Sequence, residues 1–289
     1  MAKRLIVGCG YLGRRVAERW LAASDRVHVA TRSEAKADEL RAAGFLPIIA
    51  DITNADSVPP LPPVKTLLFA VGYDRGSKQS IEQVYAPGLA NVLARRSPET
   101  QRVIYISTTG VYGPALGDWV DETTPTDPQR AGGQASLAAE LVLNASEVEG
   151  VALRLAGIYG PDRIPFRKEL EAGEPIAAIE TGWLNLIHVD DAATVVLAAA
   201  EHPATAPVYC VSDGSPVVRG DYYREVARLL GAPLPQFVTP PSDSPRAARA
   251  AADKRVSNAK LLRDLAPVLR YPNYRAGLAA ILEKSPPPG

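Results

Sequence analysis

The fold of this chain is decided close to its N-terminus, by the stretch Val7-Gly8-Cys9-Gly10-Tyr11-Leu12-Gly13. The apolar run 3–7 before it predicts a short buried strand, and residues 11–23 after it predict an amphipathic helix. The three glycines therefore stand at a strand-to-helix turn. Gly8 allows a tight turn, Gly10 leaves room for a pyrophosphate, and Gly13 permits close packing of the helix. Because the N–H groups that begin a helix are unpaired and attract phosphates, the turn predicts dinucleotide binding.

The composition is typical of a large α/β protein. The chain has 289 residues, of which 46% are apolar, enough for a sizeable core. Basic and acidic residues number 32 each, and no long run carries one sign, which argues against a nucleic-acid or membrane-surface partner. No apolar run reaches the roughly 20 residues of a membrane helix, and the N-terminus lacks a secretory pattern. We therefore expect a cytoplasmic protein that acts on a small molecule.

Strand and helix patterns alternate through the first two thirds of the chain, which predicts a doubly wound parallel sheet of the Rossmann type. In such a sheet ligands bind at the carboxyl ends of the strands. The last predicted strand should return to this sheet, so that a smaller C-terminal lobe is interleaved with it. Strands are predicted over 3–7, 26–31, 45–50, 66–71, 102–107, 151–155 and 208–211, and helices over about 11–23, 33–43, 80–96, 135–146, 167–172, 191–201, 222–230, 258–265 and 274–283.

These elements give two predicted domains. A dinucleotide-binding domain spans 1–160 and about 187–213, and a substrate-binding lobe spans about 161–186 and 214–289. Five prolines mark a loop over 233–245, which is either a substrate lid or simply a mobile loop.

The second strand ends in Thr31-Arg32-Ser33, about 20 residues past the glycine turn, where an NAD-binding chain usually carries an acidic residue. An arginine beside hydroxyl groups suits a 2′-phosphate instead, so the sequence favours NADP over NAD, the alternative being a solvated surface arginine. Asp51 ends the third strand and is either an adenine contact or a turn-capping residue. The predicted cofactor contacts are Gly8, Cys9, Gly10, Tyr11, Leu12, Gly13, Thr31, Arg32, Ser33, Asp51, Ala70, Val71 and Gly72.

Other kinds of chemistry lack their residues in this sequence. The three histidines show no metal-ligand spacing, and we expect no metal site. Neither a Walker-type phosphate loop nor a Gly-x-Ser-x-Gly elbow is present, which disfavours nucleotide hydrolysis and serine-hydrolase chemistry. Cys9 and Cys210 lie far apart in the sequence and suggest no disulfide framework.

Four stretches together resemble the extended short-chain dehydrogenase/reductases, the group that includes NAD(P)-dependent sugar epimerases and dehydratases. They occur in that family's order and span most of the chain. The resemblance implies a Rossmann fold, a nicotinamide cofactor, oxidoreductase or epimerase chemistry, and a homodimer formed through helices of the main domain. The four stretches are 8–13 (Gly-Cys-Gly-Tyr-Leu-Gly), 106–113 (Ile-Ser-Thr-Thr-Gly-Val-Tyr-Gly), 153–161 (Leu-Arg-Leu-Ala-Gly-Ile-Tyr-Gly-Pro) and 187–191 (Ile-His-Val-Asp-Asp).

The chain departs from the family's pattern in two places. Only Cys9 separates the first two glycines, where the family normally has two residues, and in this the chain looks like the atypical subgroups. The family's Tyr-x-x-x-Lys pair should precede a helical Glu that we match to Glu140, and counting back places Gly132 at the Tyr position and Ser136 at the Lys position. In the family the Tyr exchanges a proton with the substrate oxygen and the Lys lowers the pKa of that Tyr.

The sequence therefore supports an NADP-dependent oxidoreductase that acts on a small carbonyl or hydroxyl compound with a relocated proton donor. Thr108 matches the family's active-site Ser or Thr, and Tyr73 and Tyr112 are the candidate donors, with a packing role as the alternative for both. The alternative for the whole chain is a non-catalytic NAD(P) sensor or scaffold, because a vacant donor position fits both readings. A true sugar-nucleotide epimerase is the third hypothesis, and loss of the Tyr damages it most.

Overall fold

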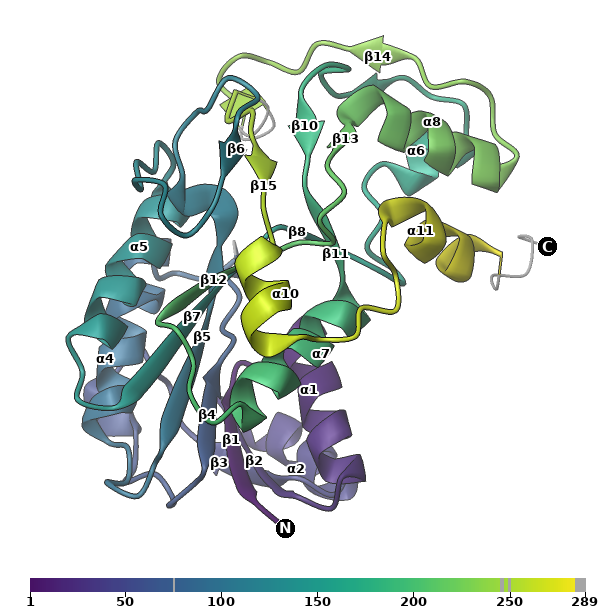
Figure 1. Cartoon of the computed structure of the whole chain (residues 1–289). Helices are drawn as coiled ribbons and strands as arrows, with labels where there is room; N and C mark the ends of the chain where they lie inside the picture. Colours follow the sequence, from purple (N-terminus) through teal and green to yellow (C-terminus); the bar gives the residue numbers. More distant parts are fainter. Residues whose placement is uncertain (75, 245–246, 249–250, 284–289) are drawn as a thin grey trace.

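The computed structural model of this chain is built around one parallel sheet of seven strands in the order β12-β7-β5-β4-β1-β2-β3 (Figure 1). It describes residues 1–74, 76–244, 247–248 and 251–283. Every neighbouring pair in the sheet is parallel, which confirms the predicted fold class. The strands are β1 (Lys3–Val7), β2 (Arg26–Thr31), β3 (Leu46–Ile49), β4 (Thr66–Phe69), β5 (Arg102–Thr108), β7 (Glu149–Leu155) and β12 (Val208–Val211).

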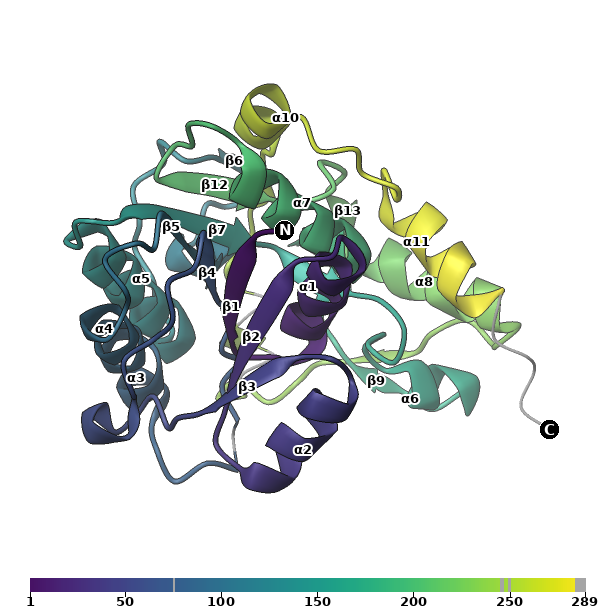
Figure 2. The same cartoon turned by 90° about the horizontal axis from the view of Figure 1, so that it is seen from below.

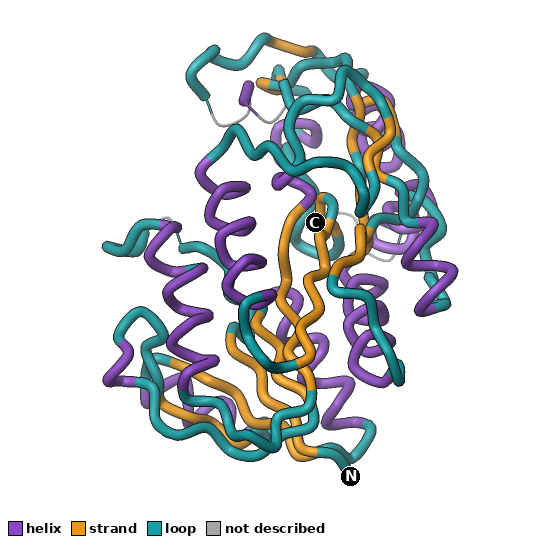
Figure 3. Tube along the Cα trace, turned by 60° about the vertical axis from the view of Figure 1, so that its left-hand side comes forward, coloured by secondary structure: helices purple, strands orange, loops and turns teal. Residues whose placement is uncertain are grey.

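Helices cover both faces of the sheet (Figures 2 and 3). Strand residues alternate between the two faces, so Ile6 packs with Val16 on one side while Leu5 packs with Leu89 on the other. The chain order reverses between β1 and β4, and this switch point is where an open α/β sheet binds its ligand. One face carries α1 (Tyr11–Ala22) and α7 (Val189–Glu201), the other carries α3 (Ile81–Val84), α4 (Ala86–Ala94) and α5 (Ala131–Asn144), and α2 (Glu34–Ala42) lies along β2 and β3.

A second hydrophobic cluster lies beyond the carboxyl ends of the strands, between α6, α8 and α11. The segments that build it are separated in sequence by the α7 and β12 unit. Its elements are β8 (Gly157–Tyr159), α6 (Arg167–Glu171), β9 (Ile176–Ala177), β10 (Trp183–Leu184), β11 (Leu186–His188), β13 (Val217–Val218), α8 (Arg219–Leu230), β14 (Phe237–Val238) and α11 (Tyr274–Leu282); the short pair β6 (Trp119–Val120) and β15 (Arg255–Val256), the 3-10 turns η1 (Ala55–Ser57) and η2 (Thr109–Val111), and α10 (Ala259–Leu265) complete the chain.

The structure differs from the sequence prediction in several elements. The helix expected over 80–96 is broken at Tyr85, because Pro87 starts a second helix, α4. Helix α5 begins at Ala131, so Gly132 and Ser136 lie in its first turns. Helix α10 packs on β12 and α7, although we assigned its residues to the lobe. The Pro-rich loop contains β14, which pairs with β9; Pro245 and residues 284–289 lie outside the described residues.

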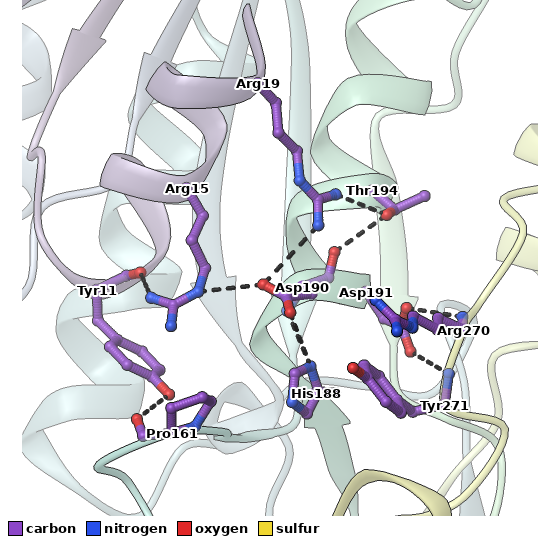
Figure 4. A network of polar contacts seen from close by, with 10 residues as sticks. All are labelled: Tyr11, Arg15, Arg19, Pro161, His188, Asp190, Asp191, Thr194, Arg270 and Tyr271. Carbon is purple, nitrogen blue, oxygen red and sulfur yellow. Dashed lines mark hydrogen bonds and ion pairs between the residues drawn. The ribbon is translucent and has the colours of Figure 1, made fainter. Parts of the chain in front are cut away.

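The stretch 187–191 joins the start of α7 to α1 and to the segment between α10 and α11 (Figure 4). Asp190 pairs with Arg15 of α1 at 3.2 Å. The buried Asp191 accepts hydrogen bonds from the backbone N–H groups of Arg270 at 2.8 Å and Tyr271 at 2.9 Å. Its two oxygens thus satisfy backbone donors that have no strand or helix partner. The stretch 187–191 therefore holds helix α1 and the C-terminal segment together.

Asp213, just after β12, should make the stability of the protein depend on pH. Its side chain is buried, and Oδ2 has no hydrogen-bond partner among the described residues. Burial raises the pKa of Asp213 to about 7, above that of an unfolded Asp. The folded state therefore favours the protonated form, and the stability that this provides is lost as the pH rises from about 4 to about 7.

We expect Asp213→Asn to raise the free energy of unfolding by about 2 kcal/mol at pH 8, with little change near pH 4. The amide keeps the shape and the hydrogen bond from Ser215 N but carries no charge. Urea denaturation of both proteins at pH 4.5 and pH 8 measures the difference. Equal stability of the two proteins at pH 8 would contradict the raised pKa.

Candidate active site

The glycine turn has the geometry expected of a dinucleotide cradle. Gly8 has φ +99°, and a Cβ there would lie 2.5 Å from the carbonyl of Ala70. At Gly13 a Cβ would lie 2.1 Å from the carbonyl oxygen of Gly8, so helix and strand approach each other closely. At Gly10 no heavy atom of the described residues lies within 4 Å of the Cβ position. The space beside Gly10, at the start of α1, is therefore open, and a phosphate group could approach the unpaired N–H groups of the helix there.

Two basic residues, Arg32 and Lys36, follow strand β2. Val7, the last residue of β1, pairs with Ala30 of β2, so the glycine turn and the segment that contains Arg32 both follow neighbouring strands at the same edge of the sheet. Arg32 is exposed, and Ser33 caps α2 by accepting a hydrogen bond from Lys36 N at 3.2 Å. Burial raises the pKa of the Cys9 thiol, and the positive charge of Lys36 offsets a small part of that rise. Lys36 was not among the predicted cofactor contacts.

Asp51 is engaged within its own turn. Its Oδ1 accepts hydrogen bonds from Thr53 N at 3.0 Å and from Thr53 Oγ1 at 2.7 Å. This is the turn-capping alternative for Asp51. The geometry gives no separate support to an adenine contact.

A cavity of about 940 Å³ runs from the glycine turn to the lobe. Its size lies near the upper end of the range for ligand pockets, large enough for part of a dinucleotide and a small substrate. Predicted residues that line it are Gly10, Tyr11, Leu12, Ala70, Val71, Gly72 and Thr108. The cavity therefore joins the predicted pyrophosphate site to the predicted catalytic threonine.

Thr108 ends β5 and caps the turn η2, where its Oγ1 accepts a hydrogen bond from Gly110 N at 3.0 Å. Gly132 and Ser136 line the cavity beside it. A Cβ on Gly132 would have Ile81 Cδ1, at 3.7 Å, as its nearest neighbour. The hydroxyl of Ser136 donates to the carbonyl of Gly132 at 2.8 Å. The position matched to Tyr, Gly132, thus leaves an open space in the cavity wall. At the position matched to Lys, Ser136 directs its hydroxyl to its own helix.

The two tyrosines predicted as proton donors do not line the cavity. Tyr112 is 2% exposed, and its hydroxyl accepts a hydrogen bond from Arg154 at 2.8 Å and contacts Cys210 Sγ at 3.0 Å. Burial raises its pKa strongly. The hydroxyl of Tyr73 donates to the carbonyl of Gln79 at 3.2 Å. This geometry favours the packing alternative for both residues.

A buried ionic network lies behind the cavity wall. Arg154 of β7 donates to Glu140 of α5 at 2.6 Å and to the Tyr112 hydroxyl, and Glu140 also accepts a hydrogen bond from Ser107. Both side chains of the ion pair are nearly inaccessible to solvent, at 8% and 4% exposure. The pair fixes α5 to β5 and β7, and with them the position of Thr108.

The fold brings to this cavity charged residues that the local sequence patterns do not assign to the site. Arg130 precedes α5, Arg163 follows β8, Arg219 begins α8 and Lys254 precedes β15. Glu169 is the one carboxylate among the described residues that line the cavity. Tyr85, at the break before α4, also lines it, and burial raises the pKa of Tyr85. The cavity is therefore rich in cationic side chains and suits anionic or polar ligands.

Two properties concern the described residues as a whole. They contain no group of three His, Cys, Asp or Glu side chains that could hold a metal ion. None of their helices combines the length and the apolar character that a bilayer-spanning segment requires.

Comparison with known proteins agrees with this geometry. The model of the NAD dependent epimerase/dehydratase family matches residues 5–211. Protein YeeZ of Escherichia coli is 30% identical over 82% of this chain and 87% of its own length. A 4-hydroxy-2-methyl-3-oxo-4-farnesyl-3,4-dihydroquinoline-1-oxide ketoreductase of Stigmatella aurantiaca is 28% identical over 73% of this chain and 67% of its own length. A functionally unknown conserved protein of Silicibacter pomeroyi has a solved structure with TM-score 0.80 and 32% identity, and the match covers 99% of both chains.

Proposed function

The chain belongs to the NAD dependent epimerase/dehydratase family, and on this premise we propose that it is an NADP-dependent oxidoreductase that acts on a small carbonyl or hydroxyl compound. The observation that carries the proposal is the continuous cavity from the open glycine turn at Gly10 to Thr108. The similarity to a ketoreductase supports carbonyl reduction as the reaction.

The residues present fit a nicotinamide dinucleotide. Gly10 leaves the start of α1 open to a pyrophosphate, and the first turn of α1 contains no acidic residue that would repel one. Ala70 to Gly72 follow β4 at the switch point and line the cavity. When bound, the reduced nicotinamide supplies a hydride to the substrate. The chain's own part is to bind and orient the substrate beside Thr108 and to supply the proton.

Arg32 is the residue on which we base the NADP preference. We expect Arg32→Ala to weaken NADPH binding at least tenfold, about 1.4 kcal/mol, because a charge-assisted contact to the 2′-phosphate is lost. NADH has no such phosphate, so its affinity should stay within about twofold. Calorimetric titration of both proteins with both nucleotides measures this, with Arg41→Ala on the outer part of α2 as a matched surface control. Equal loss for NADPH and NADH would contradict the phosphate contact.

A non-catalytic NAD(P) sensor or scaffold is the second candidate function. The observation that favours it is the pair Gly132 and Ser136 at the positions matched to Tyr and Lys, since neither side chain can act as a tuned acid. NADPH oxidation with a panel of carbonyl compounds separates the two functions. The panel contains diacetyl, phenanthrenequinone, glyceraldehyde and the 4-keto form of a sugar nucleotide. Turnover of any member supports the oxidoreductase, whereas tight NADPH binding without turnover supports the sensor.

A further inference from the structure

Lys254 is a buried cation that lines the cavity. It is 5% exposed, and its Nζ donates a hydrogen bond to the carbonyl oxygen of Tyr112 at 3.1 Å. No salt bridge within the described part of the chain involves Lys254. An ammonium has three protons, so one is directed to Tyr112 and the others remain for groups inside the cavity.

The hydrogen bond from Lys254 to Tyr112 places the ammonium on the same side of the cavity as Thr108. Thr108 and Tyr112 flank the short turn η2 at its two ends. Between them, the Cβ position of Gly110 lies 3.3 Å from Thr108 Oγ1 and 3.2 Å from Arg130 Nη2. Thr108, Arg130 and Lys254 therefore come from three separate parts of the chain and meet around one turn at the cavity surface.

Burial and the neighbouring Arg130 make the Lys254 ammonium a stronger acid than an ordinary lysine. Burial, together with a smaller contribution from the neighbouring Arg130, lowers the pKa of Lys254 to about 8, and Asp253 offsets only part of this effect. Asp253 is engaged elsewhere, because its Oδ1 accepts a hydrogen bond from Trp183 N at 2.7 Å. An acid whose pKa is near the working pH is the most effective proton donor. In this site Arg130 would lower the pKa of the acid, which is the part that the resemblance gives to the lysine of the Tyr-x-x-x-Lys pair.

We propose that Lys254 is the catalytic proton donor of this site, that Thr108 holds the same substrate oxygen, and that Arg130 is the positioning residue that tunes Lys254. The inference rests on the proposed oxidoreductase function. In carbonyl reduction the C=O π bond breaks and the carbon gains a hydride from the nicotinamide cofactor. The oxygen gains a proton from the Lys254 ammonium, which gives an alcohol. The neutral amine left on Lys254 then regains a proton from water.

The first test needs no substrate. The full-length protein is labelled with acetic anhydride from pH 6 to pH 11, and the acetylation of each lysine is measured by peptide mass spectrometry. We expect the reactivity of Lys254 to rise with a midpoint near pH 8, whereas a model peptide with an unperturbed lysine, labelled in the same mixture, has a midpoint of about 10.4. Arg130→Gln should move the Lys254 midpoint upward. A midpoint equal to that of the model peptide, or no labelling of Lys254 at any pH, would overturn the proposal.

The second test uses the best carbonyl substrate of the panel. We expect Lys254→Gln to lower kcat by about 100-fold and to leave the Kd for NADPH within about twofold. It should also remove the fall of kcat above about pH 8 that a protonated donor produces in the native protein. Lys65→Gln, at the opposite end of the sheet beside Glu201, should behave as the native protein.

Lys254→Arg separates a catalytic role from a structural one, and it keeps the test open if Lys254→Gln does not fold. An arginine keeps the positive charge and the donor to Tyr112 O but does not release a proton near neutral pH. A structural role predicts that kcat recovers, whereas the donor role predicts that it stays low. Native kcat in either folded variant, or loss of turnover in Tyr85→Phe instead, would overturn the proposal. Failure of every substrate with the native protein would overturn the oxidoreductase function itself, even with Lys254 titrating near pH 8.

Discussion

Gly13→Ala is expected to lose both stability and dinucleotide binding. The added Cβ would lie 2.1 Å from the carbonyl oxygen of Gly8, a distance that no side chain adopts. Because the neighbour is backbone, α1 must move away from β1 and the turn must open. We expect a loss of about 3 kcal/mol in the free energy of unfolding, more than the roughly 1 kcal/mol that Ala gains over Gly in a helix.

Gly10→Ala separates binding from stability. Its Cβ meets no heavy atom of the described residues within 4 Å, so the folded state accommodates the methyl group. That methyl group would occupy the space in front of the helix start where a pyrophosphate has to approach. We expect native stability and at least 100-fold weaker NADPH binding, about 2.7 kcal/mol. Chemical denaturation and calorimetric titration of both glycine variants measure the two quantities.

Gly132→Ala is the matched control for these glycines. It also replaces a glycine near the start of a helix, but the nearest atom to its Cβ is Ile81 Cδ1 at an ordinary 3.7 Å. The variant should gain up to about 1 kcal/mol of stability from helix propensity. If Gly13→Ala were as stable as Gly132→Ala, the close packing of α1 on β1 would not be what holds the turn.

The main sheet and the glycine turn were predictable because local patterns determine them. An apolar strand, a glycine turn and an amphipathic helix lie within 20 consecutive residues, and β1 and α1 appear where the sequence predicts them. The break at Tyr85 was missed because the apolar periodicity of residues 80–96 continues through it, while Pro87 acts on the backbone. Proline in the predicted helix was the available signal.

The charged part of the site could not be predicted from local patterns. Lys254 lies more than 140 residues from the turn that it contacts and follows an irregular Pro-rich region without periodicity. Tyr112 was placed beyond a strand end, which was right, but after the turn η2 its side chain is buried in contact with Arg154 and Cys210. The direction of a side chain that follows a strand depends on the turn after that strand. No periodic pattern in the sequence predicts the conformation of such a turn.

Glu140→Ala is expected to cost about 3–5 kcal/mol in the free energy of unfolding, because it leaves the Arg154 guanidinium buried without its carboxylate. Glu140 supplies acceptors for Arg154 at 2.6 Å and 3.0 Å and for the Ser107 hydroxyl. Water cannot replace them, since the arginine side chain is 8% exposed. Urea denaturation monitored by circular dichroism measures the loss. Glu18→Ala, which removes an exposed partner of Arg14, should cost about 0.5 kcal/mol or less.

The double variant Glu140→Leu with Arg154→Met decides whether charge or packing is responsible. If the cost of Glu140→Ala comes from an unpaired buried charge, removing both charges should recover most of the stability. Tyr112 and Ser107 would lose their charged partners, so recovery should stop about 1–2 kcal/mol short of the native value. A double variant as unstable as Glu140→Ala would instead assign the loss to packing between α5 and β7. In Glu140→Ala, Thr108 at the end of β5 should lose its fixed position, and the affinity for substrate should fall together with the stability.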